Sequence, residues 1–103
     1  MDNAEVGLGS VTNTSDPLAR MLNDVVVLDT ATPIVYIGKL TEITDHVFVL
    51  MDVDMHDCRD GHANKEAYLA RARTDGVPVN RRQVVVTRSF IISVSRLADV
   101  AVE

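Results

Sequence analysis

Asp52, Asp54 and His56 alternate along one apolar stretch, with a single residue between successive members. In an extended strand every second side chain points to the same face, and neighbours on that face lie about 6.6–6.8 Å apart. Two carboxylates and an imidazole on one face are ligands that a divalent metal ion can use. The other interpretation is a strand whose outer face meets water, which needs no ligand.

The second interpretation is favoured, because the spacing of these acids matches no calcium-binding loop. We therefore expect no metal ion and no cofactor. A metal-binding domain that uses Asp52, Asp54 and His56 stays open as an alternative function.

Cys58 is the only cysteine. Arg59 beside it would lower the pKa of the thiol, whereas Asp57 and Asp60 would raise it, so these neighbours do not indicate an activated thiolate. The serines lack a nucleophile elbow, and the chain has neither a phosphate-binding loop nor a dinucleotide fingerprint. The sequence therefore predicts a protein that is not an enzyme.

Acidic and basic residues are unevenly distributed. Residues 1–57 hold ten acidic and two basic residues, whereas residues 58–103 hold five acidic and eight basic ones. The net charge of −5 disfavours a general nucleic-acid binder, because phosphate neutralisation supplies most non-specific affinity. Arg81 and Arg82, just before an apolar run, are typical of charges that protect a strand edge.

Apolar alternation predicts a mainly β domain. Val and Ile supply most of the core, since aromatic residues make up only 4% of the chain. The odd positions of Val47–Met55 are all apolar, which predicts that they face the core. The even positions change from Phe48 and Leu50 to Asp52 and Asp54, which predicts a strand that begins buried on both faces, bends around a small barrel and ends in water. The predicted strands are Val25–Thr30, Ile34–Thr44, Val47–His56, Arg82–Arg88 and Phe90–Leu97, with a bend or bulge at Gly38.

Two further segments have helical composition. Pro17–Asn23, capped by Ser15 or Asp16, is predicted to form a short helix that presses Leu18, Met21 and Leu22 onto the barrel. A second helix is predicted around Lys65–Arg73, within residues 57–80. Its apolar face is weak, so residues 57–80 are expected to be a surface insertion.

These elements make one domain over residues 16–97, between a flexible tail at 1–15 and a C-terminal tail at 98–103. No apolar run approaches the roughly 20 residues of a membrane helix. The first residues lack the basic start and apolar run of a signal peptide. We therefore expect a cytoplasmic protein with no membrane partner.

Two motifs resemble those of a known family. The first joins an apolar strand, a mid-strand Gly-x-Leu, a turn with Asp and a strand with an acidic residue. The second places a basic residue in a turn between two apolar strands. They are carried by Val25–Leu28, Gly38-Lys39-Leu40, Asp45 and Asp52, and by Val84–Ile92 around Arg88. The chain thus resembles a divergent member of the Sm and Sm-like (LSm) family, over about Asp16 to Leu97.

The resemblance implies a fold and a ligand. The fold would be a short N-terminal helix on a five-stranded, strongly bent antiparallel sheet, here with a helical insertion between strands three and four. In RNA-binding members an Asn, an Arg and a stacking side chain form a pocket for one base. Arg88 matches the Arg, Asp45 lies at the turn position, and His46 is the candidate stacking side chain. The family's Met-Asn after the turn is absent and Ser89 replaces the Gly after Arg, so the implied binding of single-stranded RNA is weak.

The last two strands would be the edges of such a sheet, and unpaired edges are templates for pairing. Head-to-tail pairing of the two edges predicts a homo-oligomer, most simply a ring. The predicted interface residues are Val84, Val85, Val86, Phe90, Ile91 and Ile92. The predicted function is a non-enzymatic barrel that self-assembles and binds single-stranded RNA weakly. A protein-interaction or assembly module with no nucleic-acid role is the alternative.

Overall fold

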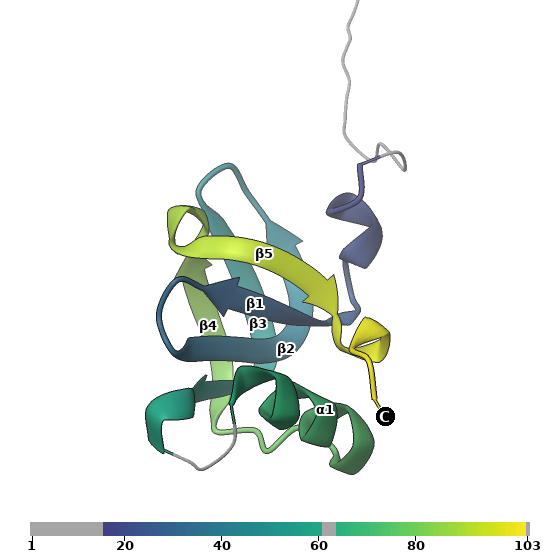
Figure 1. Cartoon of the computed structure of the whole chain (residues 1–103). Coiled ribbons are helices and arrows are strands. Elements are labelled where there is room, and N and C mark those ends of the chain that lie inside the picture. Colours follow the sequence, from purple (N-terminus) through teal and green to yellow (C-terminus); the bar gives the residue numbers. More distant parts are fainter. Residues whose placement is uncertain (1–15, 61–63, 103) are drawn as a thin grey trace, which may run out of the picture.

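The computed structural model describes residues 16–60 and 64–102. Five strands form one antiparallel sheet in the order β4-β3-β2-β1-β5 (Figure 1). Their bounds are β1 Val25–Thr30, β2 Ile34–Ile43, β3 Val47–Asp57, β4 Arg81–Thr87 and β5 Ile91–Arg96, and helix α1 spans Lys65–Asp75 between β3 and β4. The predicted mainly β fold with one inserted helix is confirmed. The expected tail at 1–15 lies outside the described residues.

Short 3₁₀ turns connect several of these elements. They are η1 Ala19–Met21, η2 Cys58–Asp60, η3 Arg88–Phe90 and η4 Leu97–Asp99. Only the single turn η1 forms within the helix predicted over 17–23. Leu18 and Met21 pack against the core as expected, whereas Leu22 is 39% exposed.

A bulge in β3 changes which side chains face the core. Gly38 lies opposite both Asp52 and Val53, because the register shifts between the pairs Ile37–Asp54 and Lys39–Met51. Asp52 has a φ of 52°, the left-handed conformation that a bulge residue can adopt. The buried positions are therefore Phe48, Leu50, Val53 and Asp54. The prediction that the odd positions face the core along the whole strand is wrong.

Gly38 lies at a position of β2 where this bulge leaves little room for a side chain. A Cβ atom on residue 38 would lie 3.0 Å from Val53 Cγ2 and 3.2 Å from the Met51 carbonyl oxygen. The irregularity falls at the predicted place along β2, but the extra residue lies in the neighbouring strand β3, opposite Gly38, and a glycine without a side chain leaves room for it.

The sheet has an apolar cluster on each face. The inner cluster fills the bent sheet and consists of Val26, Leu28, Leu40, Phe48, Leu50, Val53 and Val86. The outer cluster lies between the other face and α1, and consists of Val27, Val35, Ile37, Leu69 and Ala72. The predicted helix in the insertion is therefore present, but its small apolar face is buried against β1 and β2.

The C-terminal residues also belong to the outer cluster. Leu97 of η4 and Val100 pack against it, and Arg73 Nη1 donates a hydrogen bond to the Val100 carbonyl at 2.6 Å. The packed region thus continues past Leu97, the expected end of the domain.

Candidate functional site

The turn between β2 and β3 presents two of the predicted site residues to solvent. The Thr44 hydroxyl accepts hydrogen bonds from the backbone N–H groups of His46 and Val47, at 3.1 and 3.0 Å. Thr44 N–H donates to the Val47 carbonyl at 3.0 Å, which closes the turn. Asp45 and His46 are both exposed at its tip.

Arg88 joins this turn to η3. Its backbone N–H donates to the His46 carbonyl at 2.8 Å, and its Nη1 donates to the Thr44 carbonyl at 2.6 Å. The guanidinium carbon lies 5.1 Å from the centroid of the Phe48 ring, within the range of a cation–π contact. Arg88 is therefore brought to the turn that holds Asp45 and His46. The β2–β3 turn lies at one end of the barrel and α1 at the other (Figure 1).

The chemistry of this end suits a polar, planar ligand. A guanidinium has five N–H donors, and the bond to Thr44 uses one of those on Arg88. The His46 ring is exposed and can stack, and Asp45 offers acceptor oxygens. The Phe48 ring lies under the Arg88 guanidinium. The sequence motifs do not single out Phe48, and the signal that could have indicated it is an aromatic residue two positions after His46.

The predicted interface residues divide into buried and exposed ones. Val86 is 4% exposed and belongs to the inner core, and Val84 and Ile91 pack against that core. Val85 and Ile92 are 58% and 65% exposed, and Phe90 is 39% exposed. β4 and β5 are the two edge strands of the sheet. Each carries one strongly exposed apolar side chain, Val85 in β4 and Ile92 in β5.

The shared ligand face of Asp52, Asp54 and His56 does not form. The bulge places Asp52 in solvent, whereas Asp54 is 2% exposed, and Asp54 and His56 lie opposite Ile37 and Val35 on the face that α1 covers. Among residues 16–60 and 64–102, no group of three His, Cys, Asp or Glu side chains could hold a metal ion. The metal-site interpretation is therefore wrong for these residues.

Two other groups of this region have perturbed pKa values. Hydrogen bonds from Arg59 lower the pKa of Asp57 to about 2. Burial raises the pKa of the Cys58 thiol, which disfavours the thiolate and agrees with the predicted absence of an activated cysteine.

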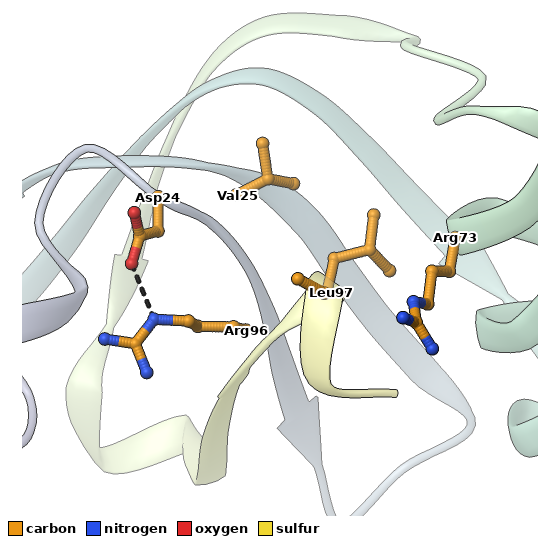
Figure 2. Close-up of a pocket in the computed structure, with 6 residues that line it drawn as sticks. Asp24, Val25, Arg73, Arg96 and Leu97 are labelled. Atoms are coloured by element: carbon orange, nitrogen blue, oxygen red, sulfur yellow. Dashed lines mark hydrogen bonds and ion pairs between the residues drawn. The ribbon is translucent and has the colours of Figure 1, made fainter. Parts of the chain in front are cut away.

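A surface pocket lies at the other end of β5 from Arg88. Its volume is about 520 Å³, and it is lined by Asp24, Val25, Arg73, Arg96, Leu97 and Ala98 (Figure 2). Arg96 Nε donates to Asp24 Oδ2 at 2.7 Å and Arg96 Nη2 donates to the Arg20 carbonyl at 3.2 Å. Because Arg73 also binds the Val100 carbonyl, both guanidinium groups hold the chain together here, and we assign them a structural role.

No helix in the described part of the chain is long and apolar enough to cross a membrane. No model of a known protein family matches the sequence, and no curated protein matches it.

Solved structures do resemble this chain. One is an Sm protein of Pyrococcus abyssii, in complex with a uridine heptamer. It is 19% identical in sequence, the TM-score is 0.55, and the match covers 80% of this chain and 94% of the other. The two chains therefore share one fold over most of their lengths.

Proposed function

We propose that this chain, whose fold is that of a divergent Sm-like protein, is a non-enzymatic barrel that self-assembles through β4 and β5. We further propose that it binds single-stranded RNA weakly, at the turn Thr44–His46 and Arg88. The observation that carries the RNA site is the position of Arg88, which is hydrogen-bonded to the turn that exposes His46 and keeps N–H donors that Thr44 does not use.

Three features support an RNA ligand at this end of the barrel. Aromatic rings and guanidinium planes both accept stacked bases, and each stacked base contributes about 1–3 kcal/mol. The His46 ring and the Arg88 guanidinium supply these two kinds of surface. The structurally similar archaeal protein has a uridine heptamer in its complex.

Two features make the proposed binding weak. The exposed Asp45 carboxylate repels phosphate where the ligand would lie. One N–H group of the Arg88 guanidinium is already hydrogen-bonded to the Thr44 carbonyl and does not contact the ligand. We therefore expect an affinity no better than the roughly 10⁻⁴–10⁻⁶ M of ordinary non-specific binders at physiological salt.

The edge strands support self-assembly. Each exposes backbone N–H and C=O groups along one side, and Val85 and Ile92 are exposed apolar side chains on the two opposite edges. Pairing β4 of one copy with β5 of the next would satisfy both edges at once, and a ring forms if the rotation between copies closes.

A protein-assembly module with no nucleic-acid role is the second candidate. The observation that favours it is Asp45, because a carboxylate at the centre of the site opposes an anionic ligand. Both candidates use the same edge strands, so RNA binding distinguishes them.

The experiment is a titration of fluorescently labelled oligouridine at physiological salt, with wild-type protein, Arg88→Ala and Arg71→Ala. Arg71 is exposed on α1, so its loss matches the change in net charge without touching the site. We expect Arg88→Ala to weaken binding by about tenfold, from the loss of stacking, and Arg71→Ala to change it only slightly.

Two outcomes would contradict the RNA site. Equal losses in the two variants would show that binding is a general charge effect. No binding by the wild-type protein at millimolar concentration would favour the assembly module.

A further inference from the structure

Asp54 is a carboxylic acid buried under α1. It is 2% exposed, and it lies opposite Ile37 of β2, a member of the outer cluster that α1 covers. Its Oδ1 accepts a hydrogen bond from Asn80 Nδ2 at 3.1 Å. Its Oδ2 is buried and has no hydrogen-bond partner among residues 16–60 and 64–102, and the same holds for the hydroxyl of Tyr68 on α1.

On the elements packed near Asp54, His56 supplies the charge that acts on the carboxyl, and the other ionisable groups are paired elsewhere or uncharged. Lys65 of α1 is paired with Asp29 of β1, with Nζ and Oδ1 2.5 Å apart. Arg59 of η2 is paired with Asp57. Burial disfavours ionisation of Cys58, and its thiol neighbours include Asp54. The His56 ring stacks on Tyr68, with centroids 3.8 Å apart and an interplanar angle of 4°.

Asn80 connects Asp54 to the segment between α1 and β4. Its backbone N–H donates to the Val53 carbonyl at 2.8 Å. Its side-chain oxygen accepts from Met55 N–H at 3.0 Å, and its Nδ2 donates to both the Asp54 carboxyl and the Met55 carbonyl. The Asp54–Asn80 contact is therefore placed where the return from α1 meets the sheet.

We propose that Asp54 is a pH-sensitive latch, which holds α1 and the segment leading into β4 against the sheet most tightly when its carboxyl is protonated. A neutral carboxyl costs little under the helix, whereas a carboxylate with one unpartnered oxygen costs much more. Loosening of α1 exposes Asp54 to water and relieves that cost.

The direction of the effect follows from burial. Burial raises the pKa of Asp54 above its ordinary value of 3.8, and the positive charge of His56 opposes the rise. We call the state with α1 packed on the sheet the docked state, and the state with α1 loosened the open state. Because the pKa of Asp54 is higher in the docked state, Asp54 stabilises docking fully below pH 3.8. This stabilisation is lost as the pH rises through the docked-state pKa. Asp57 acts in the opposite direction, but only as the pH falls toward about 2, so the two effects do not overlap above pH 4.

The test uses the wild-type protein first. The carboxyl ¹³C resonance of Asp54 is titrated by NMR, and amide hydrogen exchange of α1 is measured over the same pH range. We expect the titration midpoint of Asp54 to lie above pH 3.8. We also expect the protection factors of α1 to fall as the pH rises, by about tenfold in total for each unit by which the docked-state pKa exceeds the open-state pKa. A midpoint at or below 3.8 would overturn the proposal.

Variants then locate the effect. Asp54→Asn keeps the shape and removes the charge, so its α1 protection factors should not fall between pH 4 and 8. Asp57→Asn is the matched control and should keep the wild-type fall. A fall of equal size in Asp54→Asn would show that another group is responsible. If Asp54→Asn does not fold, His56→Phe is used instead. This substitution keeps an aromatic ring against Tyr68 and removes the charge that lowers the pKa of Asp54, so the Asp54 midpoint should rise. An unchanged or lower midpoint would contradict the proposal.

Discussion

Arg88 combines a structural role with the proposed binding role. Its backbone N–H and its Nη1 fix the turn Thr44–His46, and its guanidinium lies over the Phe48 ring. Asp45 is the residue that opposes the proposed ligand, because it is an exposed carboxylate at the tip of the same turn.

Asp45→Asn should strengthen RNA binding. The substitution removes one negative charge from the site and keeps the size and the acceptor oxygen of the side chain. We expect the dissociation constant for oligouridine to fall by a few-fold to about tenfold, since a nearby charge contributes about 1 kcal/mol in a solvent-exposed setting. Glu42→Gln, an equal charge change at an exposed position of β2, is the control. An affinity gain no larger than that of Glu42→Gln would show that Asp45 is not at the site.

The sequence predicts some of these residues and misses others for a physical reason. Asp45, His46 and Arg88 could be named only because the motifs around them resemble those of the Sm and Sm-like family. Asp54 could not be identified as buried, because its side chain follows a bulge residue, Asp52, with a φ of 52°. A single extra residue in a strand exchanges the two faces beyond it, and no composition signal indicates which residue is the extra one.

At the scale of elements, α1 is the feature that sequence patterning describes least well. Its apolar face is small, which is typical of a helix that lies on a surface. In the structure, Leu69 and Ala72 nevertheless close the outer cluster over Val27, Val35 and Ile37. Tyr68 of the same helix also packs against this cluster, so a small apolar face is enough to dock α1 on the sheet.

Leu69→Ala should therefore destabilise the whole domain. Leu69 is 8% exposed, and truncation of a buried Leu costs about 2–5 kcal/mol, with the lower end expected for a site at the rim of a cluster. Arg71→Ala, exposed on the same helix, should change stability by less than about 0.5 kcal/mol. Urea unfolding measures both variants. Equal midpoints would show that α1 is a surface insertion that the barrel does not need, as the sequence alone suggests.

At the scale of the whole molecule, the two open edges set the expected behaviour. The sheet begins at β4 and ends at β5, and the site of Arg88 lies at the turn that joins these two strands. Assembly through both edges would therefore bring copies of that site into a regular array, so that several weak contacts with one RNA strand could add up.

The backbone of Val85 is available for such pairing. The Arg88 N–H to His46 carbonyl bond lies one step beyond Val47–Thr87, the last pair of the β3–β4 ladder, and continues its register as a hydrogen-bonded position. Hydrogen-bonded and non-hydrogen-bonded pairs alternate along an antiparallel ladder, and Val85 lies opposite Val49, an odd number of steps from that pair. The N–H of Val85 therefore points to the free edge. Val85→Pro removes this donor and should abolish assembly, whereas Val85→Thr keeps the N–H and should retain it.

The mass of the wild-type protein in solution, by multi-angle light scattering at micromolar concentration, tests the central claim most directly. We expect a single species at a whole-number multiple of the chain mass of 11.3 kDa, which Val85→Pro reduces to one chain with an unchanged circular dichroism spectrum. A wild-type protein of 11.3 kDa at that concentration would contradict self-assembly through β4 and β5.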